Sequence, residues 1–408
     1  MSFLKNKVLK NAASDFIKSA LALVLFNGVI QIIIYPSFEN SLGKEAYGNA
    51  LFLISIISIM ASTFGTAANY SRMVQSTKKH DVNSDYNIFL LITGLLCIPV
   101  CIALKLYMHL DILSTVLLIA LMFFTILRFY GDCEYKLNIN YTGYFFFYTA
   151  ATVGYLIGLL LYRYLFDSWI IAILTGEVLS FIFVALRGKI YRPPVLKKSE
   201  HFKESMRSMW MLSGANIIPA IILNADRLLL HPMQGGDAVS VFYTASLVGK
   251  TISFITNPLN GVMIGYLSKY EGKFTKKMFM LFSAAILGVG LLATVACILG
   301  SYIFVSLLYP DYLSETKQYF ITANAGQVFF FISATLMVVV LRFADEKYQT
   351  YINAIYAAVF AAVVPLATYF FGIHGFSISL LAVNTIKFAV VVAIGLATVE
   401  RAQKKQEE

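Results

Sequence analysis

The sequence Gly43-Lys44-Glu45-Ala46 begins one long hydrophobic segment, and Gly235-Gly236-Asp237-Ala238, 192 positions later, begins another. After each motif, polar or small residues recur at alternating steps of three and four positions, which places them on one face of a helix. They are Ser55, Ser58, Ser62, Gly65, Asn69 and Arg72 in the first segment, and Tyr243, Ser246, Lys250, Ser253, Asn257 and Asn260 in the second. A polar face is costly in lipid, so the two series predict a duplicated membrane domain that encloses a hydrated central cavity.

The composition of the 408-residue chain is that of a membrane protein. Hydrophobic residues make up 59% of it and charged residues 13%, and the mean hydropathy is +0.73. Such a chain is too apolar for a soluble fold of this length. Apolar runs long enough to cross the bilayer as helices predict about twelve spans in an all-α polytopic fold. The expected spans are 13–35, 44–68, 85–107, 111–130, 141–163, 167–187, 208–231, 239–266, 278–306, 318–341, 348–371 and 374–398.

One long polar interval divides the chain. It runs from Arg187 to Arg207 and contains Pro193-Pro194. Six expected spans lie on either side, so both halves enter the membrane in the same direction and their symmetry axis runs along the membrane normal. We therefore expect an N-terminal six-helix lobe at 1–190, a basic cytoplasmic linker at 191–207 and a C-terminal six-helix lobe at 208–408.

The basic residues predict the orientation in the membrane. They occur near both ends of the chain and in every second loop, as at Lys78 and Lys276. Under the positive-inside rule, these loops and both termini are expected to be cytoplasmic. The net charge of +10 then mainly reflects the basic residues that set the orientation in the membrane. Because these residues are dispersed among short loops, nucleic-acid binding is disfavoured. The first apolar segment lacks a clear small-residue cleavage site, so we expect it to be retained rather than removed as a signal peptide.

Two segments resemble a known family. Ser41-Leu42-Gly43-Lys44-Glu45-Ala46-Tyr47-Gly48-Asn49-Ala50 resembles the loop between helices one and two of Wzx-type polysaccharide flippases in the multidrug/oligosaccharidyl-lipid/polysaccharide (MOP) exporter superfamily. Asn224-Ala225-Asp226-Arg227-Leu228-Leu229-Leu230, with the second glycine motif after it, resembles their seventh helix and the following loop. The spacing of these segments and the six-plus-six plan extend the resemblance over nearly the whole chain.

The resemblance implies a V-shaped, two-lobed exporter with the MATE-like fold of this superfamily. Such an exporter moves an undecaprenyl-pyrophosphate-linked oligosaccharide, an O-antigen or capsule repeat unit, from the cytoplasmic to the outer leaflet of the bacterial inner membrane. Lipid II flippases of the same superfamily usually carry two additional C-terminal helices, which makes that assignment less favoured.

Two lysines are expected near the middle of the membrane. Lys250 lies in span eight, and Lys387 lies in span twelve with Asn384 on the same helix face. Each costs on the order of 2.5–3.5 kcal/mol or more against lipid. Each is therefore expected either to line the hydrated cavity or to pair with a carboxylate between helices.

Other polar residues would extend this site along the membrane normal. Lys18, Arg72 and Arg227 lie near helix ends, where they either join a ladder of cations or extend toward phospholipid headgroups. A ladder of cations can pass a pyrophosphate across the membrane through charge-assisted contacts. The amides expected to contact neutral sugars are those of Asn216, Asn257, Asn260, Asn324 and Gln327.

Three carboxylates fall within or beside the expected spans. Asp15 lies three residues before Lys18 and is expected to form a local ion pair with it. Asp226 adjoins Arg227 and would stabilise that cation or close an outer gate. Glu177, near the middle of span six, is expected to be either a proton site or a buried partner for a membrane lysine. The coupling ion, and whether transport is coupled, stay open.

Signatures of enzymes and of bound cofactors are absent from the sequence. There is no convincing nucleophile triad and no nucleotide-binding loop, which also disfavours an ATP-driven pump. The five histidines, His80, His109, His201, His231 and His374, form no spaced set, and the four cysteines do not suggest a metal site. We therefore expect no catalytic residues, no metal and no cofactor.

The sequence thus favours a flippase for lipid-linked oligosaccharides that works by alternating access through a cationic cavity. Two alternatives remain: a cation-coupled multidrug exporter of the same fold, which should favour an acidic or aromatic cavity, and a membrane glycan polymerase, which would usually carry a larger outer loop. The expected partners are the lipid-linked oligosaccharide, membrane lipids, a glycan polymerase and its chain-length machinery, with no nucleic acid.

Overall fold

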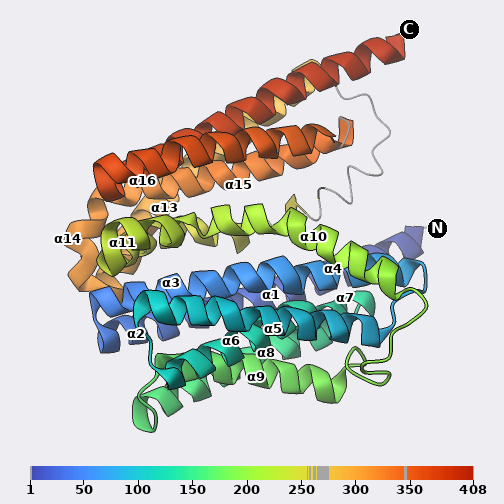
Figure 1. Cartoon of the computed structure of the whole chain (residues 1–408). Helices are drawn as coiled ribbons and strands as arrows, with labels where there is room; N and C mark the ends of the chain where they lie inside the picture. The colour runs from blue at the N-terminus through green and yellow to red at the C-terminus, as the bar shows by residue number, and fades with distance from the viewer. Residues whose placement is uncertain are drawn as a thin grey trace. The chain divides into compact units, whose positions relative to one another are not determined.

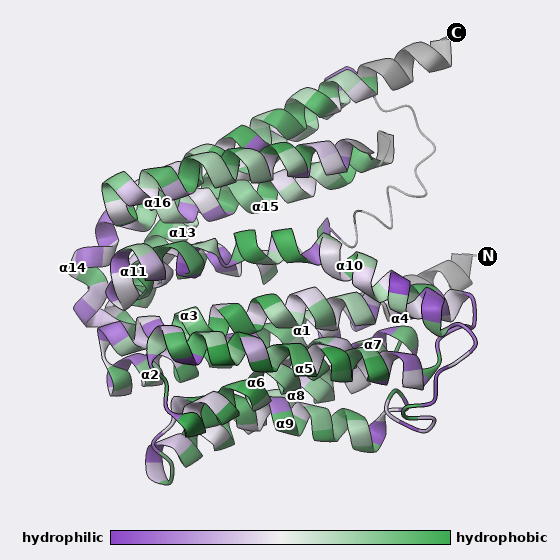
Figure 2. Ribbon diagram, viewed as in Figure 1, coloured by the Kyte–Doolittle hydropathy of each residue, from purple (hydrophilic) through white to green (hydrophobic). Residues whose placement is uncertain are grey.

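The regular elements of the computed structural model are all helices in the part of the chain that it describes (Figure 1). That part comprises residues 2–254, 256, 259–260, 263, 275–343 and 347–407, with side chains described from Ser14 onward except at 16, 342–343, 347 and 400–407. Ten described helical segments are long and apolar enough to cross a membrane. Hydrophobic residues predominate along these helices, whereas hydrophilic residues gather at helix ends and in connecting segments (Figure 2). The expectation of an all-α polytopic membrane protein is confirmed.

The difference between twelve expected spans and ten segments has two sources. The expected spans 348–371 and 374–398 lie in one segment, Tyr348–Val399, because two helices join without a loop at Gly372, where the backbone is not helical (φ 58°, ψ −138°). The expected span 239–266 extends beyond the described residues, so only its first part is seen, in helix α11 (Ala225–Thr251).

The chain divides into two compact units. Unit 1 comprises Met1–Gly43 and Leu53–Asn224, and unit 2 comprises Lys44–Phe52 and Ala225–Glu408. Helix α3 (Lys44–Met60) therefore begins in unit 2 and continues into unit 1. Helix α10 (Phe202–Leu223), which the expected C-terminal lobe contains, groups with unit 1 by packing. The lobes at 1–190 and 208–408, which follow the sequence repeat, stay a prediction.

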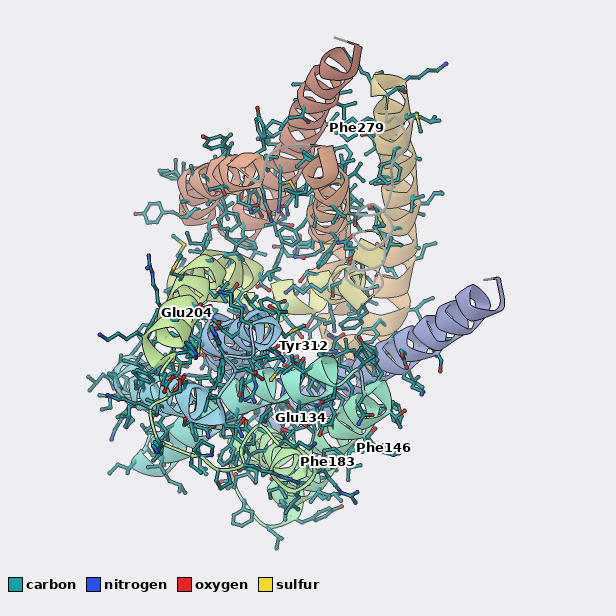
Figure 3. The ribbon with its side chains drawn as sticks, turned by 90° about the vertical axis from the view of Figure 1, so that its right-hand side faces the viewer. Glu134, Phe146, Phe183, Glu204, Phe279 and Tyr312 are labelled. Carbon is teal, nitrogen blue, oxygen red and sulfur yellow. The ribbon has the colours of Figure 1, made fainter. Side chains whose placement is uncertain are left out.

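Unit 1 is a bundle of long helices joined by short turns. Helix α8 (Tyr141–Tyr164) packs along α9 (Trp169–Arg187) through small residues, since a Cβ atom added at Gly154 would lie 2.6 Å from the Cα atom of Gly176. The Glu134 carboxylate, labelled in Figure 3, accepts the backbone N–H groups of Lys189 and Ile190 at 2.9 and 3.1 Å and so fixes the segment after α9. The other elements of this unit are α1 (Ser2–Val29), η1 (Ile30–Ile34), α2 (Tyr35–Leu42), η2 (Ala61–Gly65), α4 (Thr66–Thr77), α5 (Asn83–Met108), α6 (Ile112–Gly131), α7 (Cys133–Leu137), α8 (Tyr141–Tyr164) and α9 (Trp169–Arg187).

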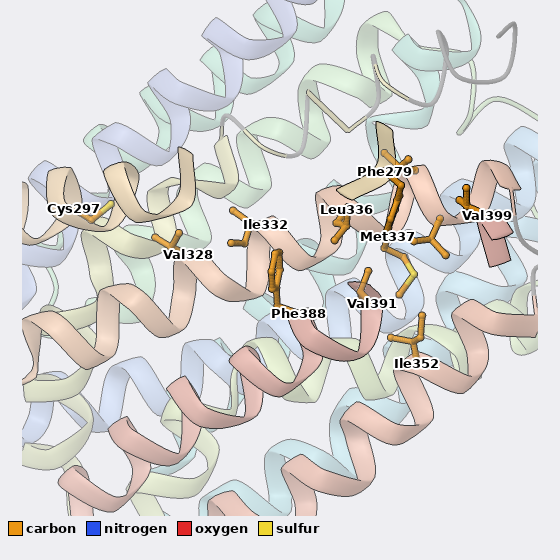
Figure 4. Packing of buried hydrophobic residues seen from close by; sticks show 12 residues of the cluster. Phe279, Cys297, Val328, Ile332, Leu336, Met337, Ile352, Phe388, Val391 and Val399 are labelled. Carbon is orange, nitrogen blue, oxygen red and sulfur yellow. The ribbon is translucent and has the colours of Figure 1, made fainter. Parts of the chain in front are cut away.

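Unit 2 is built around α15 (Phe320–Phe343), which packs along α16 (Lys347–Glu407) and also contacts α11 and α13 (Lys276–Leu308). Its apolar core includes Phe279, Leu336 and Val391, each fully or almost fully buried (Figure 4). Three short elements join α13 to α15, namely η3 (Pro310–Tyr312), α14 (Leu313–Thr316) and η4 (Lys317–Tyr319). This core holds the polar residues of α11, α15 and α16 in place.

The two glycine motifs share a backbone conformation and pack against each other in unit 2. Gly43 has φ 79° and ψ 170°, and Gly235 has φ 84° and ψ 179°, values open only to glycine. The N-terminal turns of the helices that follow are in close contact, because a Cβ atom added at Gly48 would lie 1.9 Å from the carbonyl oxygen of Gly236. His231 and Asn49 hydrogen-bond across the same contact at 2.9 Å.

A π-helical turn interrupts the first polar series. Helix α3 gives way to η2 (Ala61–Gly65) before α4 begins. One extra residue in a turn rotates everything after it by about 100°, the angle of one residue at 3.6 per turn. Consequently, Gly65, Asn69 and Arg72 do not continue the face of Ser55 and Ser58. They are buried inside unit 1, where Gly65 lies against α6, and whether the series lines a cavity stays a prediction.

Candidate functional site

A cluster of charged residues lies inside unit 2, at the two ends of helix α11. The kink at Gly235 lets the chain fold back, so Lys250 reaches Asp226 and donates a hydrogen bond to its Oδ2 atom. The Nε atom of Arg227 lies 3.6 Å from the other carboxylate oxygen. The side chains of Lys250, Arg227 and Asp226 are only 17%, 12% and 4% exposed. Two buried cations thus share the carboxylate of Asp226.

An aromatic ring completes this cluster. The centroid of the Tyr243 ring lies 4.8 Å from Nζ of Lys250 and 5.3 Å from Cζ of Arg227. Tyr243 and Lys250 are both members of the second polar series, seven residues apart on one helix face. A cation over an aromatic face gains about 0.5–2 kcal/mol, more when desolvated. The ring therefore holds both cations near each other and offsets part of their mutual repulsion.

Lys387 occupies a different environment. It is 8% exposed and lies over the rings of Phe330 and Tyr356, at 4.2 and 4.3 Å from their centroids. No carboxylate of the described residues lies within 4.0 Å of its ammonium group. Asn384 is satisfied by other groups, since it accepts from the Tyr356 hydroxyl at 2.8 Å and donates to the Gly326 carbonyl at 2.9 Å. Of the two readings made from the sequence, an ion pair therefore describes Lys250 but not Lys387.

Glu177 is part of a closed ion pair in unit 1. Its carboxylate accepts from Nε of Arg128 at 2.7 Å and from the Tyr155 hydroxyl at 2.6 Å. The Arg128 guanidinium also lies over the rings of Phe26 and Phe129 at 4.9 and 4.8 Å. The buried partner of Glu177 is thus an arginine of α6, not a lysine of unit 2. Such fully satisfied groups suit a structural role at the α6, α8 and α9 contact.

The other cations of the expected ladder also have local partners in unit 1. Arg72 is buried, donates to the Tyr130 hydroxyl and to Asn83 Oδ1 (2.6 Å), and lies 5.1 Å from the Tyr86 ring centroid. Lys18 donates to Oγ1 of Thr142 at 3.0 Å. Among the residues whose side chains are described, Asp15 forms no ion pair with Lys18.

Four of the five expected sugar-binding amides fall into three groups. Nδ2 of Asn216 and Oδ1 of Asn260 are buried without a hydrogen-bond partner in the described part of the chain, so both retain polar capacity for a ligand. Asn324 is used internally, because its Oδ1 accepts from the Gly249 N–H at 2.7 Å and its Nδ2 donates to Oγ of Ser301 at 3.0 Å. Asn257 lies outside the described residues.

Two arrangements were not foreseen from the sequence. Arg128 meets Glu177 across 49 positions, and no spacing rule connects residues on α6 and α9. His80 and His201 stack at 3.5 Å between ring centroids, with Glu204 beside them, although the sequence offered no spaced histidine set. The only local signal was the three-residue step from His201 to Glu204 at the start of a helix.

No protein-family model and no curated protein matches the chain. Solved structures do match over nearly its whole length. An inward-facing multidrug resistance MATE transporter of the MOP superfamily aligns with a TM-score of 0.69 at 11% identity, covering 93% of this chain and 95% of that one. This chain has the MATE fold. An outward-facing MATE transporter of the same superfamily aligns with a TM-score of 0.62 at 13% identity, covering 96% of both chains. The bent form of the Vibrio cholerae MATE transporter VcmN aligns with a TM-score of 0.55 at 15% identity, covering 97% and 98%.

Proposed function

We propose that this MATE-fold chain is a transporter that moves a polyprenyl-pyrophosphate-linked oligosaccharide from the cytoplasmic to the outer leaflet of a bacterial inner membrane. The observation that carries the proposal is the excess of buried positive charge on the membrane helices of unit 2. Lys250, Arg227 and Lys387 are buried there, and no carboxylate of the described residues lies within 4.0 Å of the Lys387 ammonium group. An uncompensated cation in hydrocarbon is costly, so its retention favours an anionic ligand.

A pyrophosphate headgroup suits this arrangement. Phosphate oxygens accept charge-assisted hydrogen bonds that are roughly twice as strong as neutral ones. Lys250 and Arg227 can turn toward such a group while Asp226 keeps their positive charges partly balanced, so binding stays weak enough for release. Lys387, held by Phe330 and Tyr356 instead of a carboxylate, offers a second cation in the same unit.

In this proposal the MATE fold serves for transport here, as it does in the solved transporters, and the protein works by alternating access. The oligosaccharide would then be handled by neutral amides such as Asn216 and Asn260, which retain free polar atoms. The partners that such a flippase serves are a glycan polymerase and its chain-length machinery, downstream of the flipped lipid. O-antigen and capsule repeat units fit the site equally well, because both present the same headgroup.

A cation-coupled multidrug exporter is the second candidate, because two of the solved structures that share the fold are named multidrug resistance transporters. A cationic drug requires an available carboxylate. The buried carboxylates of Asp226 and Glu177 are instead each engaged by a cation. The ion pairs therefore favour the anionic substrate.

The experiment that separates the two candidates is deletion of the coding sequence in the native host, followed by analysis of lipid-linked glycans and of drug sensitivity. Accumulation of lipid-linked oligosaccharide on the cytoplasmic face supports the flippase. Unchanged glycans with altered drug sensitivity support the exporter.

A further inference from the structure

Two histidines and a glutamate converge at the start of helix α10 in unit 1. His80 follows the turn that ends α4, while His201 and Glu204 belong to the first turn of α10 and its cap. One potential ligand atom from each residue lies within 4.8 Å of the other two. The imidazole rings are stacked nearly parallel, with 3.5 Å between centroids and 11° between planes. Figure 3 shows Glu204 on α10 at the edge of this unit.

The ring nitrogen of His80 that faces Glu204 lacks a hydrogen bond. Nδ1 of His80 lies 3.4 Å from Oε2 of Glu204, but this atom is buried without a hydrogen-bond partner among the described residues. The other carboxylate oxygen, Oε1, accepts from Nζ of Lys78 at 2.9 Å. An unpaired imidazole nitrogen directed at a carboxylate oxygen is the arrangement that a cation between them would satisfy.

The backbone around these three residues is firmly held. The His80 N–H donates to the Gln75 carbonyl at 3.1 Å, and the His201 N–H donates to Oγ of Ser199 at 3.1 Å. Ser199 in turn donates its N–H and hydroxyl to the buried Asp85 carboxylate, at 3.1 and 2.5 Å. The ligand-bearing segments are therefore fixed before any ion binds, which lowers the entropic cost of binding.

We propose that His80, His201 and Glu204 bind one Zn²⁺ ion, which ties the end of α4 to the start of α10. Zinc bound by two imidazoles and a carboxylate keeps a fourth position for water. Ligand atoms about 2.0–2.1 Å from a tetrahedral zinc ion lie roughly 3.4 Å from one another. His80 Nδ1 and Glu204 Oε2 already have this separation, and a ring nitrogen of His201 lies within 4.8 Å of a ligand atom of each.

The donor set selects the class of ion. Imidazole nitrogens favour zinc and neighbouring transition metals, whereas magnesium and calcium prefer oxygen ligands alone. Lys78 stays on the outer oxygen of Glu204, where it balances the carboxylate without occupying the ion's position. All three ligands belong to unit 1, so the ion would be a tie within that unit, whatever substrate the protein moves.

Zinc titration calorimetry on the full-length chain in detergent, with the affinity tag removed and bound metal stripped by a chelator, tests this site. We expect one zinc ion per chain and a rise in the midpoint temperature of thermal unfolding with zinc concentration. His80→Ala and His201→Ala should each weaken zinc binding at least about tenfold, and Glu204→Gln should also weaken it. Co²⁺ in place of Zn²⁺ should give a visible absorption band that the His80→Ala variant lacks.

His109→Asn is the matched control, because His109 is an exposed histidine in the left-handed region (φ 53°), which asparagine tolerates. Its zinc affinity should equal that of the wild type. Each variant is first shown to match the wild type in gel filtration and in metal-free thermal unfolding, and His80→Asn replaces His80→Ala if the latter does not. Absence of saturable zinc binding by the wild type, or equal zinc affinity in the wild type and the His80→Ala/His201→Ala double variant, would overturn the proposal.

Discussion

The Ser240 hydroxyl donates a 2.7 Å hydrogen bond to the backbone carbonyl of Lys44. A shift of 192 positions, the spacing of the two glycine motifs, relates this pair to Gly236 and Gly48, which are also in close contact. The contact is therefore reciprocal, as in a twofold interface where each side contributes the same surface. The duplication seen in the sequence is thus reflected in the packing of its two copies.

Gly48→Ala should destabilise the protein, because the new methyl group would lie 1.9 Å from the carbonyl oxygen of Gly236 and force the two helices apart. We expect a loss of about 1–3 kcal/mol in the free energy of unfolding, measured by thermal unfolding in detergent. Gly288→Ala is the control, since it sits in helix α13 of the same unit with open space around its Cβ position. That change should be neutral or stabilising. Equal stabilities for the two variants would contradict the close contact.

Substitutions at Lys250 should impair glycan export in a graded manner. Lys250→Arg keeps the charge and should retain the most export, Lys250→Ala should lose much of it, and Lys250→Glu should lose more because it repels a phosphate. The measurement is the amount of surface glycan in cells that carry each variant at native protein levels. Normal export by both the alanine and glutamate variants would show that Lys250 does not contact the substrate.

Asp226→Asn separates a structural ion pair from a substrate-binding cation. Breaking a buried pair by removing either partner destabilises a protein by about 3–5 kcal/mol. If Lys250 served only that pair, Asp226→Asn would impair export as much as Lys250→Ala does. We expect instead that Asp226→Asn retains more export, because Lys250 and Arg227 remain to bind the anion.

Lys387→Met should separate stability from function. The lysine is buried among aromatic rings without a carboxylate partner in the described structure, so an apolar side chain of similar length removes a desolvation cost. We expect thermal stability equal to or up to about 2 kcal/mol above that of the wild type, with reduced export. A variant that exports normally would remove Lys387 from the substrate path, and a strongly destabilised one would assign it a structural role.

Glu177 and Arg128 should behave as a structural pair. Glu177→Gln and Arg128→Met each leave one buried charge without its partner and should lower the unfolding free energy by about 3–5 kcal/mol. The Arg128→Met/Glu177→Met double variant should be closer to the wild type in stability than either single variant, and its pH profile of transport should be unchanged. An altered pH profile in a stable double variant would favour the alternative role of Glu177 as a proton site.

The membrane orientation, still a prediction, can be tested by labelling introduced cysteines. Glu200 and Ser314 are both exposed, and the four native cysteines are buried, so the background reaction should be low. In intact cells, a membrane-impermeant thiol reagent should label Ser314→Cys but not Glu200→Cys. Labelling of both from outside would contradict the expected cytoplasmic linker.

The fold was accessible from the sequence because its strongest signals are local. The length of the apolar runs predicts where the membrane helices lie. The motifs at Gly43 and Gly235 predict equivalent turns, and in the structure these share one backbone conformation. The expected spans 348–371 and 374–398 meet where the structure has non-helical backbone, at Gly372, so hydropathy located this break between two helices.

The candidate site was only partly accessible. Lys250 and Asp226 were both singled out, but their contact depends on the fold-back at Gly235. A π-helical turn lies between Ser58 and Asn69 and rotates the second half of the first polar series relative to the first half, a shift that a periodic pattern cannot reveal in advance. The partner of Glu177 was missed because Arg128 lies on a different helix. The charges and spacing within one segment do not show which residues of another helix will lie beside it.

The most direct test of the central claim is flipping of a short-chain polyprenyl-pyrophosphate-linked oligosaccharide by the purified protein in proteoliposomes, read from the fraction of lipid that an added glycosidase can reach. We predict that the protein exposes lipid from the inner leaflet faster than protein-free vesicles, and that Lys250→Glu abolishes the gain. Equal exposure with and without the protein, together with uptake of a cationic drug, would contradict the account.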